Sequence, residues 1–216
     1  MNVINLGASN TIFNQFIAEI RSVDIQKDSM RFRRNCERLG EIFAYEISKK
    51  LSYESSNIIT PLGEAPIQLL SEQPVLATIL RAGLPLHQGL LNYFDKADNA
   101  FVSAYRKHRK DGSFMIEAEY MASPSLEDRI VILSDPMLAS GASMVEIYKL
   151  LLEKGKPKQI HIVSLIASVE GVDFVKKQLP EDTIIWVGAI DAELTAQSYI
   201  VPGLGDAGDL AFGAKE

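Results

Sequence analysis

The stretch from Ile130 to Leu152 constrains the fold of this chain most, because a short loop of small residues there joins an apolar run to a helix pattern. The β-branched run 130–133 is typical of a strand buried on both faces of a parallel sheet. Asp135 follows it, and the small residues 139–143 precede the helix. The first turn of a helix offers free N–H groups and the positive end of its dipole, so the stretch predicts a phosphate site.

A second interpretation of this loop requires no ligand. Ser140 and Ser143 could donate hydroxyl groups to an anion, but serines and small residues also form plain helix caps and tight turns. The acid at the end of the strand favours a ligand site, because open α/β sheets bind ligands at that edge. The loop at 135–143 matches neither GxxxxGK[ST] nor GxGxxG, so neither a P-loop nor a dinucleotide site is indicated there.

The composition is that of one globular domain, 1–216, with 47% hydrophobic and 23% charged residues. A net charge of −6 argues against nucleic acid as a partner. The single cysteine, Cys36, excludes an internal disulfide and a cysteine-cluster metal site. We find neither a secretory signal nor an apolar run long enough to span a membrane, and therefore expect a cytoplasmic protein.

Further strand patterns alternate with helix patterns along the chain. The strands are expected at 74–80, 100–105, 159–166 and 183–190. This alternation predicts an α/β fold with a mainly parallel twisted sheet flanked by helices. Arg81 directly follows a buried strand, so we expect an anion or an acid beside it.

The strand at 100–105 ends at Arg106 and leads into the basic stretch 107–112. This stretch predicts a β-hairpin flap, returning through 114–121, that covers an anionic substrate. A solvated loop without a ligand is the alternative.

Apolar residues spaced by three and four predict a long helix that begins after Asp28, with Cys36 as a buried, inert thiol. The arginines Arg31, Arg33 and Arg34 are expected on a solvated face or a subunit contact rather than at a phosphate site. Residues 1–27 are expected to form an entry segment with modest local order, and 52–73 to form short strands or turns.

The tail 199–209 is rich in glycine and aspartate, which predicts neither a helix nor a central strand. A frayed terminus is the usual interpretation of such a tail. Its apolar residues instead favour an ordered loop whose bare N–H and C=O groups read the edge of a flat heterocycle.

Three segments closely resemble motifs of the uracil phosphoribosyltransferases: DPMLASGAS at 135–143, ILRAGL at 79–84 and YIVPGLGDAGD at 199–209. Shorter matches occur at 31–33, 105–106 and 170–171, in the same order along the chain. The resemblance spans residues 31–215, with gaps around 52–73 and 107–128. It implies a type I phosphoribosyltransferase fold with a small base-binding hood from the terminal segments, and the conversion of uracil and phosphoribosyl diphosphate (PRPP) to UMP and diphosphate.

The resemblance also implies the site residues. Those matching the PRPP contacts are Arg81, Arg106, Asp135, Pro136, Met137, Leu138, Ala139, Ser140, Gly141, Ala142, Ser143 and Asp206. Those matching the uracil contacts are Ile200, Gly205, Asp206 and Ala207. Asp135 and Arg106 are the expected catalytic residues. Mg²⁺ is expected on the substrate diphosphate and water, with no protein ligand. A homo-oligomer, dimer or tetramer, is expected, and GTP is an effector to be tested.

The chain departs from the family pattern at Ala142, where the family usually has glycine, and a methyl group there would be strained if φ were positive. Leu210-Ala211 and Ala214 also replace usual family residues. Two other functions are therefore weighed: a pyrimidine-responsive RNA-binding regulator, which the acidic charge disfavours, and a catalytically inactive ligand sensor. A cis peptide bond is also considered in the loop between Leu80 and Gly83, since strained backbone collects at ligand sites.

Overall fold

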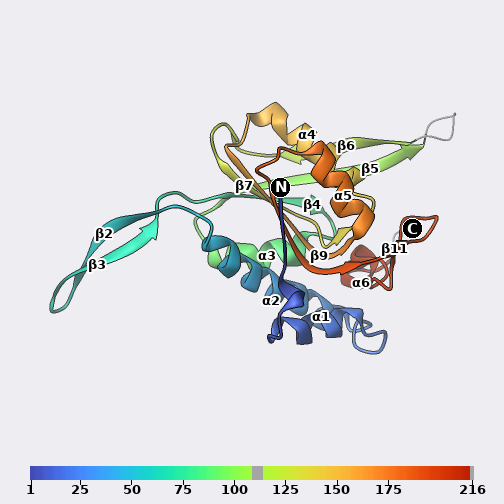
Figure 1. The fold of residues 1–216 in the computed structure, drawn as a ribbon, viewed down its shortest axis with the longest axis horizontal. Helices are drawn as coiled ribbons and strands as arrows, with labels where there is room; N and C mark the ends of the chain where they lie inside the picture. The colour runs from blue at the N-terminus through green and yellow to red at the C-terminus, as the bar shows by residue number, and fades with distance from the viewer. Residues whose placement is uncertain (109–113, 215–216) are drawn as a thin grey trace.

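A sheet of mainly parallel strands forms the centre of the molecule, in the order β1-β10-β9-β7-β4-β5-β6 (Figure 1). Its strands are β1 (Asn2–Asn5), β4 (Val75–Leu80), β5 (Asp98–His108), β6 (Phe114–Ala122), β7 (Ile130–Ser134), β9 (Gln159–Ser168) and β10 (Ile184–Asp191), and the short β8 (Met137–Leu138) pairs with β9. All pairs in this sheet are parallel except β5–β6. This computed structural model describes residues 1–108 and 114–214, of which 104–108 and 114–119 are described as backbone alone.

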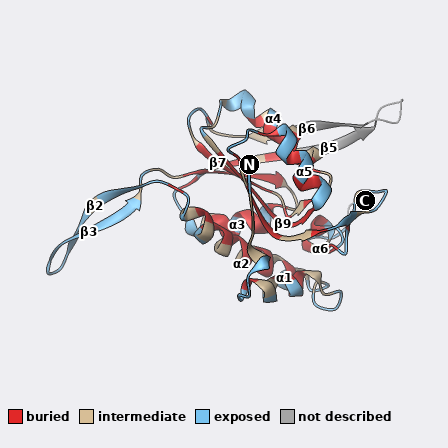
Figure 2. Ribbon diagram, in the orientation of Figure 1, coloured by how far each residue is buried: buried red, intermediate tan, exposed pale blue. Residues whose placement is uncertain are grey.

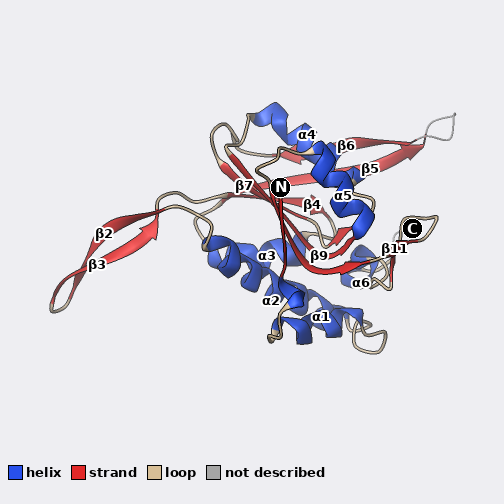
Figure 3. Ribbon diagram, viewed as in Figure 1, coloured by secondary structure: helices blue, strands red, loops and turns tan. Residues whose placement is uncertain are grey.

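Helices cover both faces of the sheet, as the α/β prediction requires (Figure 3). Packed on one face are α4 (Ala142–Leu151) and α5 (Val169–Gln178). Packed on the other are α1 (Phe13–Arg21), α2 (Ser29–Ser48), α3 (Leu84–Tyr93) and the short α6 (Ala207–Phe212). Two 3-10 turns lie at Leu6–Ala8 and Leu152–Lys154.

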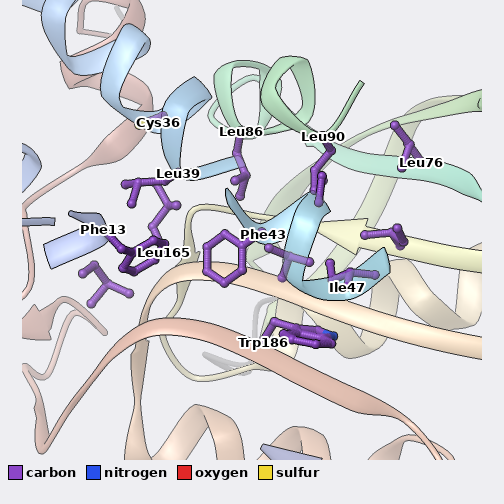
Figure 4. Packing of buried hydrophobic residues seen from close by; sticks show 14 of the residues in the cluster. Phe13, Cys36, Leu39, Phe43, Ile47, Leu76, Leu86, Leu90, Leu165 and Trp186 are labelled. Carbon is purple, nitrogen blue, oxygen red and sulfur yellow. The ribbon is translucent and has the colours of Figure 1, made fainter. Parts of the chain in front are cut away.

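The apolar strands bury side chains on both faces. Along β7, Ile130 and Ile132 join the core beneath α1, α2 and α3, whereas Val131 and Leu133 join the core beneath α4 and α5. Successive side chains of a strand point to opposite faces, so a continuous apolar run serves both cores. Figure 4 shows Phe43 of α2 close to Leu165 and Trp186 of the sheet. Burying one such large side chain contributes about 1.5–3 kcal/mol.

The long helix α2 confirms the prediction made from its apolar stripe. Asp28 caps it by accepting a hydrogen bond from the N–H of Arg31 at 3.0 Å. Cys36 is 2% exposed, and burial raises the pKa of its thiol above its usual value. The thiol is therefore inert, as expected.

The arginine cluster at the start of α2 agrees with the expectation of a solvated face, because Arg31 and Arg34 are exposed and Arg33 is half-buried. Arg31 forms an ion pair with Glu19 at 2.9 Å, Arg33 donates to the carbonyl oxygen of Ala211 at 2.6 Å, and Arg34 forms an ion pair with Glu37 at 2.7 Å. Each arginine thus has an intramolecular partner, and these partners lie in three different segments.

The first 27 residues are more ordered than predicted. Strand β1 pairs with β10 at one edge of the central sheet, and α1 buries Phe13, Ile17 and Ile20. Both elements are short, four and nine residues, so their periodicity was too brief to stand out in the sequence.

Between α2 and β4, the strands β2 (Tyr53–Thr60) and β3 (Gly63–Leu70) form a two-stranded antiparallel arm that projects from the body (Figure 2). The expected short strands or turns are thus one long hairpin. Pro66 is tolerated because β3 has a hydrogen-bonded neighbour on one side only. The second hairpin, β5–β6, confirms the predicted hairpin, with His108 opposite Phe114. The tip of the basic stretch, 109–113, lies outside the described residues, and the covering of a substrate stays a prediction.

Candidate active site

A cavity of about 340 Å³ opens where β4 and β7 end at their carboxyl edges. Its wall consists of residues 80–82, 135–137, 143, 197–199 and 205–208. Ligands of open α/β sheets bind at this edge. The cavity therefore brings together Arg81, Asp135 and the glycine-rich tail, which lie far apart in the sequence.

The predicted phosphate loop forms a smaller cavity of about 70 Å³ beside the first. The two cavities share Asp135, Met137 and Ser143. Gly141, with φ of 78°, holds the left-handed conformation of the loop, and Ala142 is the first residue of α4. The strain considered for Ala142 is therefore absent, because the position that needs glycine has it.

The phosphate loop rests on the start of α5. Ser168 donates through its hydroxyl to the carbonyl oxygen of Ala139 at 2.6 Å and accepts from the N–H of Gly171 at 2.8 Å. A Cβ at Gly171 would lie 2.1 Å from the same carbonyl oxygen. Ser168 was missed in the sequence because its role depends on a loop 29 residues away. Gly171 belongs to the Glu170-Gly171 match, to which the sequence assigned no role.

Asp135 stands half-buried where β7 meets this loop, and its backbone N–H donates to Val163 at 3.0 Å. Desolvation raises the pKa of its carboxyl to about 7. The backbone N–H of Met137 acts in the opposite direction, and the carboxylate of Asp206 raises the pKa further. A cationic group or ligand in the cavity would favour the ionised carboxylate.

Arg81 lies at the end of β4, after a cis peptide bond between Leu80 and Arg81, within the loop where such a bond was considered. Its guanidinium donates to Asp209 Oδ1 at 2.9 Å and to the carbonyl oxygen of Gly213 at 2.7 Å. Its Nε is buried and has no hydrogen-bond partner among the described residues. The acid expected beside Arg81 is therefore present.

The tail forms the opposite wall of the cavity. The short strands β11 (Glu193–Leu194) and β12 (Ile200–Val201) pair antiparallel and lead into the loop that carries Gly205. The prediction that this segment contains no helix is wrong, because Asp206 caps α6 by accepting from the N–H of Asp209 at 2.9 Å. Ala207 and Ala211 of α6 are buried in the core, and this packing outweighs the low helix propensity of Gly208.

The expected site residues divide into four groups. Arg81, Asp135, Pro136, Met137, Ser143, Gly205, Asp206 and Ala207 line the larger cavity, and Leu138, Ala139, Ser140 and Gly141 line the smaller one. Ala142 and Ile200 lie outside both linings, Ala142 as the first residue of α4 and Ile200 with its side chain in the core. Arg106 lies on β5, but its side chain is outside the part of the chain that the structure describes.

The cavity wall also contains residues that were not predicted to bind a ligand. Gln197 and Ser198 line it next to Tyr199, and Ser198 has φ of 63°, a conformation uncommon for residues other than glycine. Gly208 lines it from α6. No sequence pattern marks Gln197 and Ser198 as site residues, because they precede the glycine-rich motif.

The positions of the acidic side chains among the described residues show whether the protein itself could ligate the expected Mg²⁺. No three histidine, cysteine, aspartate or glutamate side chains converge in that part of the chain. Asp135 and Asp206 do line one cavity. This donor set fits a Mg²⁺ ion held mainly by substrate oxygens and water, as such ions commonly are.

No helix within the described ranges is long and apolar enough to cross a membrane.

Comparisons with known proteins agree with this geometry. The family model described as uracil phosphoribosyltransferase matches residues 8–214. A uracil phosphoribosyltransferase of Porphyromonas gingivalis is 56% identical over 215 residues, covering all of both chains. One of Methanococcus vannielii is 40% identical over 193 residues, covering 88% of this chain and 82% of its own.

Solved structures agree on the fold. The AQ2163 protein of Aquifex aeolicus superposes with a TM-score of 0.85 at 27% identity, covering 98% of each chain. A hypoxanthine phosphoribosyltransferase of Staphylococcus aureus gives a TM-score of 0.52 at 14% identity, covering 86% of this chain and 83% of its own. The second likeness concerns the fold alone.

Proposed function

The chain belongs to the uracil phosphoribosyltransferase family, and we propose from this premise how its residues divide the reaction. The activity is the transfer of ribose 5-phosphate from PRPP to N1 of uracil, which gives UMP and diphosphate. The observation that carries the proposal is the cavity at the sheet edge, because it joins the phosphate loop to the glycine-rich tail.

The phosphate loop 135–143 binds the 5-phosphate of PRPP in this proposal. Support comes from the small cavity between Asp135 and Met144, and from the start of α4 beside it. The first N–H groups of that helix and the hydroxyls of Ser140 and Ser143 are donors suited to a phosphate. Ser140 keeps the hydroxyl of the usual family threonine.

Asp135 binds the ribose hydroxyls and stabilises the positive charge that develops at C1 as diphosphate departs. Its place where the two cavities meet supports this role. A carboxylate fixed beside a developing cation lowers the energy of an oxocarbenium-like transition state. Arg81 and Arg106 bind the diphosphate and offset its growing negative charge. Arg81 lines the same cavity, which supports its part.

Uracil binds against the tail. Gly205, Asp206 and Ala207 form the cavity wall opposite Asp135, and backbone groups of these residues and of Ile200 read the edge of the base. Gly205, with φ of 94°, adopts a conformation in which its N–H and C=O groups are unobstructed by a side chain. Asp206 also contacts the ribosyl donor.

When bound to the diphosphate of PRPP, Mg²⁺ would neutralise charge there and so supply a better leaving group. The chain's own residues orient the sugar and the base. In the absence of a nucleophile–histidine pair in the cavity wall described above, positioning and charge stabilisation supply most of the rate.

Three expectations remain. A homo-oligomer, dimer or tetramer, and GTP as an effector rest on the family resemblance, whereas a cytoplasmic location rests on the sequence pattern. The inactive-sensor alternative depended on strain at Ala142, and Gly141 takes the left-handed conformation instead. Within the part of the chain that the structure describes, nothing favours the RNA-binding alternative.

The proposal is tested by incubating the protein with PRPP, Mg²⁺ and uracil and measuring UMP. Parallel reactions replace uracil with cytosine, hypoxanthine, guanine or orotate. We expect UMP from uracil and little product from the other bases, because the tail presents fixed donors and acceptors. Absence of UMP at saturating substrates would contradict the proposed activity.

A further inference from the structure

One ion pair connects the first helix to the strand that precedes the uracil loop. Arg21, the last residue of α1, donates from Nη1 to Asp191 Oδ2 at 2.9 Å and from Nη2 to Asp191 Oδ1 at 2.8 Å. Asp191 ends β10 and is 8% exposed. A bidentate arginine–carboxylate pair fixes both position and orientation. Loss of Arg21 would leave the carboxylate of Asp191 buried without its counter-charge.

Both members of this pair also bind Gly203. The Nη1 of Arg21 donates to the carbonyl oxygen of Gly203 at 3.2 Å, and the N–H of Gly203 donates to Asp191 Oδ2 at 2.9 Å. Gly203 has φ of 55°, and a Cβ there would lie 2.1 Å from the carbonyl oxygen of Ile200. The backbone at Gly203 is therefore held through both of its hydrogen-bonding groups, and Ile200 leaves no room for a side chain at this position.

Gly203 lies two residues before Gly205, where the tail enters the cavity wall. Arg21, Asp191 and Gly203 are not among the described residues that line the cavity. A displacement of about 1 Å in a binding group can cost about 100-fold in rate. The hydrogen bonds from Arg21 and Asp191 to Gly203 can therefore determine the position of the cavity wall at 205–208, although neither side chain lines the cavity.

We propose that Arg21 and Asp191 are positioning residues that set the place of the uracil-binding backbone, and through it the affinity for the base. The inference rests on the proposed function, because it takes 205–207 as the uracil wall. It assigns no contact with substrate to either side chain. It predicts a large loss of uracil affinity with at most a small change in PRPP affinity, because the phosphate loop is held by Ser168 and α5 and the tail contributes only Asp206 to the PRPP contacts.

A second ion pair on α1 provides a matched control. Arg31 donates from Nε and Nη2 to the two carboxylate oxygens of Glu19 at 3.0 and 2.9 Å. Glu19 is 8% exposed, as Asp191 is. This pair ties α1 to α2 and makes no hydrogen bond to residues 200–208 within the described chain. It has the same chemistry as the Arg21–Asp191 pair without the connection to the tail.

The experiment compares Arg21→Met, Asp191→Asn and Arg21→Lys with Arg31→Met. Initial rates of UMP formation give KM for each substrate while the other is saturating, and melting temperatures report stability. We expect the KM for uracil to rise about tenfold in the first two variants, with the KM for PRPP within about twofold of wild type. Lysine at position 21 restores part of the uracil affinity, since it keeps one charged donor. Arg31→Met lowers the melting temperature and leaves both KM values within about twofold.

An unchanged uracil KM in Arg21→Met, or an equal rise in Arg31→Met, overturns the proposal, because the pair would then be merely structural. If Arg21→Met fails to fold, Asp191→Asn and Arg21→Lys decide by the same criteria. A wild-type protein that makes no UMP contradicts the proposed function instead. Amide hydrogen exchange at 203–207 then tests the positioning role independently. Faster exchange in Asp191→Asn than in Arg31→Met supports it, and equal exchange overturns it.

Discussion

The two walls of the cavity are held in different ways. The phosphate loop lies between consecutive elements, β7 and α4, and its supports come from the neighbouring unit at Ser168 and Gly171. The uracil loop is held by side chains from the other end of the chain: Arg21 binds Gly203 across 182 residues, and Arg33 binds Ala211 across 178. The phosphate site is thus a property of one local motif, whereas the base site depends on the completed fold.

Substituting Asp135 with Asn tests the chemical role of the phosphate wall and should have the largest effect. We expect turnover to fall by about 100- to 1000-fold, because the charge opposite the developing oxocarbenium ion is lost while the shape is kept. Steady-state turnover at saturating substrates measures the loss, and the melting temperature shows whether the fold persists. Turnover within about fivefold of wild type would remove Asp135 from its assigned role.

Gly171→Ala tests whether the phosphate wall depends on the close approach of α5. A Cβ there would lie 2.1 Å from the carbonyl oxygen of Ala139, so the loop must shift. We expect the KM for PRPP to rise about 10- to 100-fold with the uracil KM nearly unchanged, the reverse of the Arg21 variants. Substrate titrations measure both constants. A rise confined to uracil would break the division between the two walls.

Asp209→Asn tests the contact that joins the walls, since Arg81 from β4 binds Asp209 of α6. We expect both KM values to rise about three- to tenfold, because the charge that orients Arg81 and the end of α6 is weakened. The exposed ion pair between Arg129 and Asp98, at 3.0 Å, supplies the control. As the control, Asp98→Asn should leave both KM values unchanged. If Asp209→Asn raises the KM for PRPP alone, the contact between Arg81 and Asp209 positions only the phosphate wall.

The pH dependence of stability should reveal the electrostatic cost in the phosphate wall. The pKa of Asp135 is raised to about 7 in the folded chain, above its ordinary 3.8, so the folded state binds the proton more tightly. The contribution of Asp135 to stability therefore falls as pH rises from about 4 to about 7. We expect Asp135→Asn to melt about 2–6 °C above wild type at pH 8, and the difference to disappear at pH 4. Thermal melts across this range measure it, and a constant difference would contradict the raised pKa.

The features that the sequence predicts are the ones built from local patterns, as the phosphate wall is, and not the ones that depend on long-range contacts, as the base wall does. The β7–α4 unit, the buried strands and the apolar stripe of α2 are local patterns, and the structure confirms them. The elements β1 and α1 were missed because they are short. The helix α6 was missed because Asp206 and core packing outweigh the propensity of its glycine. The contacts of Arg21 with Asp191 and Gly203 depend on tertiary structure, and no spacing in the sequence reveals them.

The long separation between Arg21 and Gly203 has a consequence for the order in which the protein becomes functional during synthesis. The chain emerges from its N-terminus during synthesis, and domains generally fold as units. The strands of the central sheet end at Asp191. The base wall is completed only after residues 200–212 have emerged and bound Arg21 and Arg33. The residues that form the phosphate loop therefore emerge before those that select the base, and the last of the chain completes the site.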